Sequence, residues 1–256
     1  MTVSNNDVPT QNTACNALSE RFVVISYNLH GYNQGRPGIT ELISTLGPDA
    51  IMVQEHWLTP DNLYKLNQIS DDYFVFGSSA MTNIVRSGPL FGRPFGVTAI
   101  LVNKKHITTV VNLISCDRYT AIKVANWLLI TVYMPCVGTI QRDLLYIDIL
   151  HQLQILLDTH PNCSWLIGGD FNTNLDSGVN VSSVVNQFMS CNKLSRCDML
   201  FPVADNFTFF NESTESGTTI NYMLTSNPNN TIAFNVLDMD INLSNHIPIM
   251  VVCTCR

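Results

Sequence analysis

Short apolar runs that end in a polar residue are the feature that most constrains this chain. In residues 164–174, the bulky run 165–167 is followed by two glycines and then by Asp170 and Asn172. A short, bulky run bounded by turn formers predicts a buried strand that ends at the glycines, where another group can approach closely. In an extended chain Asp170 and Asn172 would point the same way. The pattern indicates a reaction centre, with an Asx-type turn as the alternative.

The same pattern recurs earlier in the chain. Three more predicted strands end in a polar residue that is able to bind a cation or a phosphate: 22–28 in Asn28, 49–55 in Glu55 and 127–133 in Tyr133. A polar cluster that contains His246 precedes a last predicted strand. Taken alone, Glu55 has the simpler interpretation of a solvated strand end, and His246 that of a packed histidine. Strands of one sheet would bring these side chains to one edge, where α/β folds place their sites.

The remaining patterns alternate between helical and extended spacing. Helices are predicted over 38–46, from about residue 59, over 139–157 and over 180–191. Further strands are predicted over 73–76, 96–103, 107–114, 119–125, 207–210, 220–225, 232–237 and 247–252. Residues 1–20 are polar and are interpreted as a flexible leader. We therefore predict an α/β fold in one domain over 21–256.

Composition limits the partners. The net charge is -7, which argues against a broad basic nucleic-acid face but not against a local one. The eight cysteines form no C-x-x-C pair and are interpreted as free, mostly buried thiols of a reducing compartment. No secretory signal and no apolar run of about 18 residues is present, so we expect an intracellular protein without a membrane span.

Five motifs in order resemble a known superfamily: Y-N-x-x-G (27–31), Q-E-H-W (54–57), V-Y-M-P (132–135), G-G-D-F-N (168–172) and S-N-H-x-P-I (244–249). They are similar to the endonuclease/exonuclease/phosphatase superfamily of DNase I-like and exonuclease III-like enzymes. The resemblance implies a four-layered α/β sandwich, in which two central β-sheets are flanked by helices. The closest resemblance is to the endonuclease domain of LINE-type non-LTR retrotransposons, through Q-E-H-W-L, the Gly/Pro-rich segment 87–97 and R-Y at 118–119.

The resemblance also implies roles for individual residues. Glu55 would hold the metal, with Asn28 beside it as a ligand or phosphate contact, and Asp170 would activate the attacking water. Asn172 and Tyr133 would hold the phosphate, and His246 would stabilise charge on its oxygens. Phosphodiester hydrolysis requires a positioned water and neutralised phosphate oxygens. Mg²⁺ suits a site with few carboxylates, and Mn²⁺ is the alternative ion.

Two positions depart from the family pattern. Asn221 stands where the family has an Asp that supports the catalytic histidine, and Asn245 stands where it has the Asp of S-D-H. The loss of a carboxylate would make His246 less basic. Asp238 and Asp240 lie upstream and are expected on a solvated loop rather than as replacements.

Three functions follow from this resemblance. The leading hypothesis is a metal-dependent endonuclease that nicks target DNA in the nucleus, followed by a reverse transcriptase domain in a longer polyprotein. Candidate DNA contacts are Arg86, Arg93 and Arg118. The second is a nucleic-acid-binding remnant in which the two asparagines impair catalysis. The third is a phosphoesterase for a small phosphorylated substrate, which the acidic balance favours.

Overall fold

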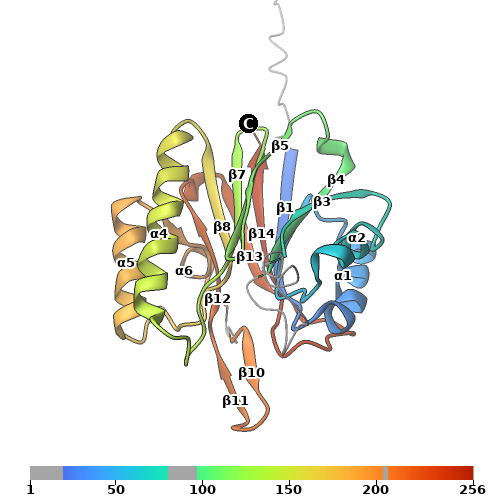
Figure 1. Ribbon diagram of the computed structural model, residues 1–256. Coiled ribbons are helices and arrows are strands. Elements are labelled where there is room, and N and C mark those ends of the chain that lie inside the picture. The colour runs from blue at the N-terminus through green and yellow to red at the C-terminus, as the bar shows by residue number, and fades with distance from the viewer. Residues whose placement is uncertain (1–19, 80–96, 204–206, 256) are drawn as a thin grey trace, which may run out of the picture.

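The computed structural model describes residues 20–79, 97–203 and 207–255, in which two six-stranded sheets face each other (Figure 1). The first sheet has the order β13 (Thr231–Val236), β14 (Ile249–Cys255), β1 (Glu20–Asn28), β2 (Ala50–Gln54), β4 (Thr98–Asn103) and β3 (Tyr73–Gly77). The second has the order β5 (Val110–Ser115), β6 (Tyr119–Val124), β7 (Trp127–Tyr133), β8 (Ser164–Asp170), β12 (Asn221–Thr225) and β9 (Ser195–Arg196). Each sheet contains one parallel pair, β1 with β2 and β7 with β8.

Helices cover the outer face of each sheet, which confirms the predicted four-layered sandwich (Figure 1). The helices α1 (Tyr32–Leu46) and α2 (Tyr64–Asn67) lie outside the first sheet, and α4 (Arg142–Thr159) and α5 (Asn180–Cys191) lie outside the second. A one-turn helix α6 (Cys197–Leu200) and the short 3₁₀ turns η1 (Pro60–Asn62), η2 (Lys104–His106) and η3 (Pro228–Asn230) complete the described helices. None of the described helices is both long and apolar enough to cross a bilayer.

Three apolar clusters fill the three interfaces between these layers. One joins the first sheet to α1, a second lies between the sheets, and a third joins the second sheet to α4 and α5. The alternation of side chains along a strand explains this division, because neighbouring residues face opposite sides of a sheet. In β8, for example, Leu166 belongs to the cluster between the sheets and Ile167 to the cluster under the helices.

The two glycines of β8 have a different role from the one predicted. The strand does not end at them but continues to Asp170. A Cβ on Gly168 would lie 2.4 Å from the sulfur of Met223 and 2.7 Å from that of Met52, so the missing side chain lets both methionines approach. Gly169 has a φ of 148° and lies against Val132 of β7. The predicted close approach is thus confirmed, and the predicted strand end is wrong.

Several predicted boundaries are also wrong. Helix α1 begins at Tyr32 rather than at 38, because Gly35 lies on Leu29, where a Cβ would be 2.5 Å from the leucine. The helix expected from residue 59 is only η1 followed by the single turn of α2. The strand expected over 207–210 is β10 (Phe209–Asn211), which pairs with β11 (Ser216–Thr218) in a hairpin that projects beyond the sheets (Figure 1).

The cysteines follow their prediction in part. The six whose side chains are described form no disulfide. Cys197 and Cys253 are buried, whereas Cys136 and Cys191 are exposed. For the six described thiols the prediction that most are buried is wrong, because four of them lie at the edges of elements, where packing is incomplete.

Candidate active site

The candidate site lies where the carboxyl ends of the two parallel strand pairs meet. In the first sheet Asn28 ends β1 and Glu55 directly follows β2, and in the second Tyr133 and Asp170 end β7 and β8. The expectation that one sheet would supply the site is wrong. The two sheets each contribute one half, because they pack face to face with these strand ends on the same side.

An asparagine amide connects the two carboxylates. Asn28 Nδ2 donates to Glu55 Oε1 over 2.8 Å and to Asp170 Oδ2 over 2.9 Å. Its Oδ1 accepts a hydrogen bond from the backbone N–H of His30 over 3.0 Å. The amide therefore presents its N–H groups to the acids. Asn28 holds Glu55 and Asp170 at a fixed separation, and its oxygen faces the backbone.

Glu55 occupies a strained backbone position. Its φ is 52°, in the left-handed region that costs about 1–3 kcal/mol for a non-glycine residue. Glu55 Oε2 accepts a hydrogen bond from Trp57 Nε1 over 3.1 Å. The turn after β2 aims the carboxylate towards Asp170 instead of continuing the strand. The neighbouring His56 is buried and bonds Ser78 O and the Leu58 N–H, so it supports the turn rather than the site.

His246 faces the acids from the last loop. Its Nδ1 donates to Asn221 Oδ1 over 2.9 Å, which leaves Nε2 as the acceptor nitrogen, 4.0 Å from Asp170 Oδ2. Burial, together with the nearby His30, lowers the pKa of His246 to about 3. The imidazole is therefore neutral at neutral pH. Asn221 orients this ring as an Asp would, but without the negative charge.

A network that the sequence did not predict holds the loop before His246. Asn242 Oδ1 accepts from Tyr27 OH over 2.8 Å and from the Ser244 N–H over 3.0 Å, while its Nδ2 donates to His246 O over 2.9 Å. Ser244 Oγ donates to Asn28 O over 2.8 Å. The histidine is thereby tied to the same strand end that carries Asn28.

Asp170 has a strongly shifted titration. Burial and then the Glu55 charge raise the pKa of Asp170 to about 8, although the Asn172 and Asn28 donors act against this shift. The side chain is 1% exposed. Asp170 is thus largely protonated at neutral pH in the protein alone, and a cation beside its carboxyl would favour the charged form.

The donor set fits a hard divalent cation. Ligand atoms of Glu55, Asp170 and His246 all lie within 4.8 Å of one another. Asn245 Oδ1 is buried and has no hydrogen-bond partner among the described residues, as expected beside an ion or an ordered water. The oxygen donors of the two carboxylates suit Mg²⁺ or Mn²⁺. Glu55 and Asp170 would hold the ion, with His246 at its edge.

Asn172 does not extend from the strand as predicted. Its φ of 49° turns the chain, its N–H bonds Asp170 Oδ1 over 2.8 Å, and its Nδ2 donates to Met134 O over 2.8 Å. The side chain therefore ties the loop after β8 to the loop after β7. Tyr133 ends β7 close by. Burial and the charges of Glu55 and Asp170 raise the pKa of its phenol, so the hydroxyl remains a proton donor.

The other predicted residues divide into two groups. Arg118 lies at the site, with its guanidinium 5.5 Å from the centre of the Tyr133 ring. Arg86 and Arg93 fall outside the described residues. Asp238 and Asp240 are exposed, and the backbone N–H of Asp240 bonds Glu41 on α1. These two acids lie on a surface loop, as expected, and neither is part of the Glu55–Asp170–His246 cluster.

Two residues of α4 support the site and were missed from the sequence. Arg142 donates to Pro135 O over 3.0 Å and to Asn172 O over 2.6 Å, and Tyr146 OH donates to Phe171 O. They therefore hold the backbone on both sides of the site. The sequence feature that could have indicated this role is an arginine in the first turn of a helix that follows the V-Y-M-P motif. Helical spacing alone gave no reason to assign Arg142 a role at the site.

We expect Arg142→Lys to loosen these loops while the fold is kept. Lysine retains the charge but cannot bond two carbonyls as a planar fork does. The loss of one charge-assisted hydrogen bond of about 1.5 kcal/mol would slow turnover roughly ten-fold with little change in KM. Hydrogen exchange measured by NMR should be faster at the Met134 and Asn172 amides, and Arg36→Lys on the exposed side of α1 is the control. Unchanged exchange at both amides would contradict this role.

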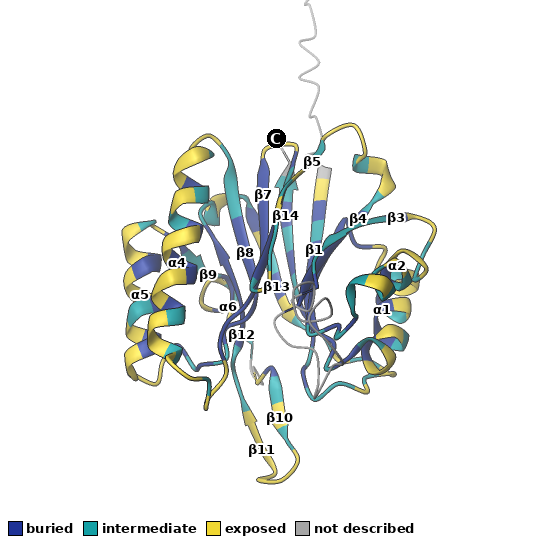
Figure 2. Cartoon of the chain, viewed as in Figure 1, coloured by how far each residue is buried: buried dark blue, intermediate teal, exposed yellow. Residues whose placement is uncertain are grey.

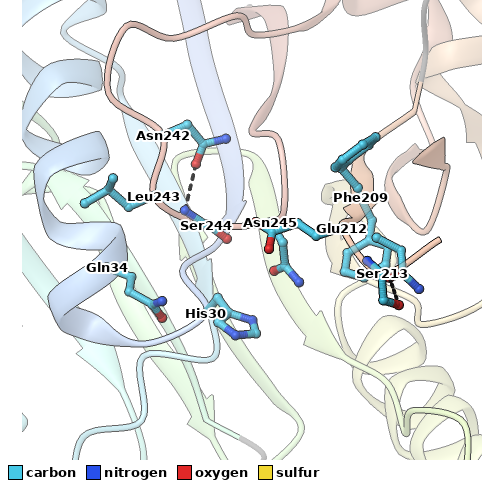
Figure 3. Close-up of a pocket in the computed structure, with 11 residues that line it drawn as sticks. His30, Gln34, Phe209, Glu212, Ser213, Asn242, Leu243, Ser244 and Asn245 are labelled. Carbon is cyan, nitrogen blue, oxygen red and sulfur yellow. Dashed lines mark hydrogen bonds between the residues drawn. The ribbon is translucent and has the colours of Figure 1, made fainter. Parts of the chain in front are cut away.

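A cleft of about 650 Å³ adjoins His246 (Figure 3). In Figure 3, Ser244 and Asn245 lie between Gln34 on one side and Ser213 of the hairpin loop on the other. The ring of Phe209, which also lines the cleft, is 4.9 Å from the His246 ring. The lining is rich in amides, hydroxyls and phenylalanine, and the only carboxylate among the lining residues is Glu212.

Comparison with known proteins decides the family. The profile of the Endonuclease/Exonuclease/phosphatase family matches residues 25–243, which include most of the site. The chain belongs to this family. A search of curated proteins finds no match.

Solved structures show the same fold at low sequence identity. The family member resembles the 3′ phosphatase NExo from Neisseria, bound to a product DNA hairpin, with a TM-score of 0.68 and 15% identity over 90% of this chain and 98% of that one. An endonuclease/exonuclease/phosphatase family protein from Bacteroides thetaiotaomicron has a TM-score of 0.67 and 16% sequence identity, over 93% of this chain and 99% of that one. The AP endonuclease LMAP from Leishmania major has a TM-score of 0.72 and 12% sequence identity, over 92% of this chain and 88% of that one.

Proposed function

We propose that this family member is a divalent-metal-dependent phosphodiesterase that cuts DNA. The observation that supports this proposal is that Glu55, Asp170 and His246, from three distant motifs, place their ligand atoms within 4.8 Å of one another. Asn28 bridges the two acids and Asn221 orients the histidine, so hydrogen bonds hold all three side chains in this arrangement. The family match over 25–243 supports a hydrolytic phosphoester reaction.

Each residue has a role that its chemistry permits. Asp170 accepts the proton of the attacking water, for which it must be ionised, and a cation bound beside it would favour that charged form. The Tyr133 hydroxyl donates to a phosphate oxygen, and Asn172 keeps both loops in register around it. Glu55 would hold Mg²⁺, and the ion would neutralise charge on the phosphate oxygens. His246 lies beside Asp170 with Nε2 as its acceptor nitrogen, so it donates to the oxygens that gain charge only once Nε2 has taken up a proton.

The finer proposal is target-site nicking for a LINE-type element, with DNA as substrate and a reverse transcriptase as the functional partner in a longer polyprotein. It is supported by the segments Q-E-H-W-L and 87–97 and by Arg118 next to Tyr133. Action in the nucleus belongs to the same proposal.

We expect supercoiled plasmid to be nicked in the presence of Mg²⁺, and the nicking to be lost in Glu55→Ala. Binding of the ion should also raise the melting temperature, since a ligand that binds only the folded state stabilises it by about 2.7 kcal/mol at 100 times its Kd. Glu55→Gln should remove this rise. An exposed acid far from the site, Asp61→Asn, is the control. Equal nicking by the unchanged protein and by Glu55→Ala would contradict the proposed endonuclease activity.

One observation favours a second candidate, a phosphoesterase for a small phosphorylated substrate. The cleft beside His246 is of ligand size and has no lysine or arginine among its lining residues, so it suits an uncharged polar group better than a polyanion. A panel of nucleotides and inositol phosphates, compared with plasmid at equal enzyme concentration, separates the two functions. Faster turnover of a small ester would favour the second.

A further inference from the structure

The outward side of α4 and the loop before it carry aliphatic side chains that no described residue covers. The exposed fractions are 81% for Val137, 86% for Ile140, 63% for Leu144, 50% for Ile147 and 53% for Ile155. We call these five residues the α4 stripe. The opposite side of the helix is also apolar and buried, through Tyr146, Ile149, Leu150, Leu153 and Leu157. A surface helix normally has a polar outer side, so the stripe requires an explanation.

The spacing of the stripe matches that of a helix–helix contact. Leu144, Ile147 and Ile155, together with the exposed His151, follow one another at intervals of three or four residues and so lie on one side of α4. From Leu144 to Ile155 the row is roughly 17 Å long at 1.5 Å per residue. Figure 2 shows exposed residues along the side of α4 that faces away from the sheets. A straight apolar row of this kind is what a second helix covers.

Acidic side chains surround the stripe. Asp143, Asp148 and Asp158 are all exposed. Asp148 and Asp158 each accept a hydrogen bond from a glutamine amide, over 2.8 and 2.9 Å. None of the three aspartates forms an ion pair within the described residues. The single arginine of α4 turns away to Pro135 O and Asn172 O. The rim of the stripe is therefore negative and unneutralised.

We propose that the α4 stripe is the docking surface for an amphipathic helix of a partner protein that has lysine or arginine along its flanks. The apolar row accounts for the affinity, and the acidic rim selects a basic partner. A second copy of this chain fits poorly, because a symmetric contact would place three aspartates against three aspartates. The surface lies outside the Glu55–Asp170–His246 cluster, so this inference stands independently of the proposed reaction.

The test uses two fluorescein-labelled helical peptides of about 18 residues with leucine at heptad positions a and d. One carries lysine on its flanks and the other carries glutamate. We expect the full chain to bind only the lysine peptide by fluorescence anisotropy. The triple variant Leu144→Gln, Ile147→Gln, Ile155→Gln should weaken binding at least about ten-fold, as should Asp143→Asn, Asp148→Asn, Asp158→Asn. Ile107→Gln with Ile232→Gln, at exposed positions elsewhere, is the matched control.

Three outcomes would overturn the proposal. The first is unchanged binding of the lysine peptide by the glutamine triple variant, which would mean adsorption by charge alone. The second is a dimer in light scattering that the same variant abolishes, which would make a second copy the occupant. The third is sedimentation with phosphatidylcholine/phosphatidylserine vesicles that the variant abolishes, which would make a lipid surface the occupant. All substituted side chains are exposed, so melting temperatures should stay within about 2 °C of the parent.

Discussion

Asp170→Asn is expected to abolish hydrolysis and, at the same time, to make the protein more stable. The Asp170 carboxyl is buried beside Glu55, and its pKa is raised to about 8 from an ordinary value of 3.8. In the unfolded chain it ionises freely, so the folded state loses stability relative to the unfolded state as pH rises from about 4 to about 8. An asparagine of the same size carries no such penalty. It also cannot accept the proton of the attacking water.

The size of this effect depends on pH. Each pKa unit corresponds to about 1.4 kcal/mol, so the gain in the free energy of unfolding should be of order 1 to 2 kcal/mol at pH 5 and several kcal/mol at pH 8. Thermal unfolding in EDTA at the two pH values measures this difference, at about 2–4 °C for each kcal/mol. Addition of Mg²⁺ should narrow the gap between parent and variant, because the ion favours the charged carboxylate.

The matched control is another buried aspartate whose charge is paired. Asp198 Oδ2 lies 2.6 Å from Arg196 Nη2, and its side chain is 5% exposed. Removal of this charge leaves Arg196 without a buried partner, so Asp198→Asn should lower the melting temperature. A fall in stability for Asp170→Asn at pH 8 as well would show that Asp170 is not held in an unfavourable charged state.

Asn221→Asp is expected to speed hydrolysis. Asn221 Oδ1 accepts the Nδ1 proton of His246 over 2.9 Å, so a carboxylate at this position would bond the same proton with a full negative charge. The pKa of His246, now about 3, would then rise and the ring would become a stronger base. In the catalytic triad of serine proteases, the reverse change from Asp to Asn costs about 10⁴ in turnover, and a gain of about ten-fold or more in plasmid nicking is expected here.

The measurement compares the parent, Asn221→Asp, Asn245→Asp and the double variant at pH 7 with Mg²⁺. Asn245 Oδ1 is buried without a partner among the described residues, so a carboxylate there should mainly tighten Mg²⁺ binding. The exposed Asn235→Asp on β13 adds the same charge away from the site and is the control. Nicking that appears only after the substitutions would identify the natural chain as a nucleic-acid-binding remnant. Equal rates in all forms would show that the asparagines do not limit the reaction.

The fold was largely predictable because its signals are local. Strand ends at Asn28, Glu55, Tyr133 and Asp170 follow from short apolar runs, and α5 follows from its spacing. The errors occur where distant contacts override a local signal. Gly35 resembles a helix breaker but lies inside α1 because Leu29 packs on it. Gly168 resembles a strand end but lies inside β8 because Met52 and Met223 fill the space of its side chain.

The sequence by itself determined which residues end the strands, the family and the two asparagine departures, since motif order and spacing are properties of the chain. Only the tertiary structure decided how these groups meet. It placed Asn28 between Glu55 and Asp170 although 142 residues separate it from Asp170, drew Arg142 under both loops, and kept His246 neutral. The physical reason is that periodicity reflects neighbours in sequence, whereas hydrogen-bond partners and pKa values depend on burial and charges brought together by packing.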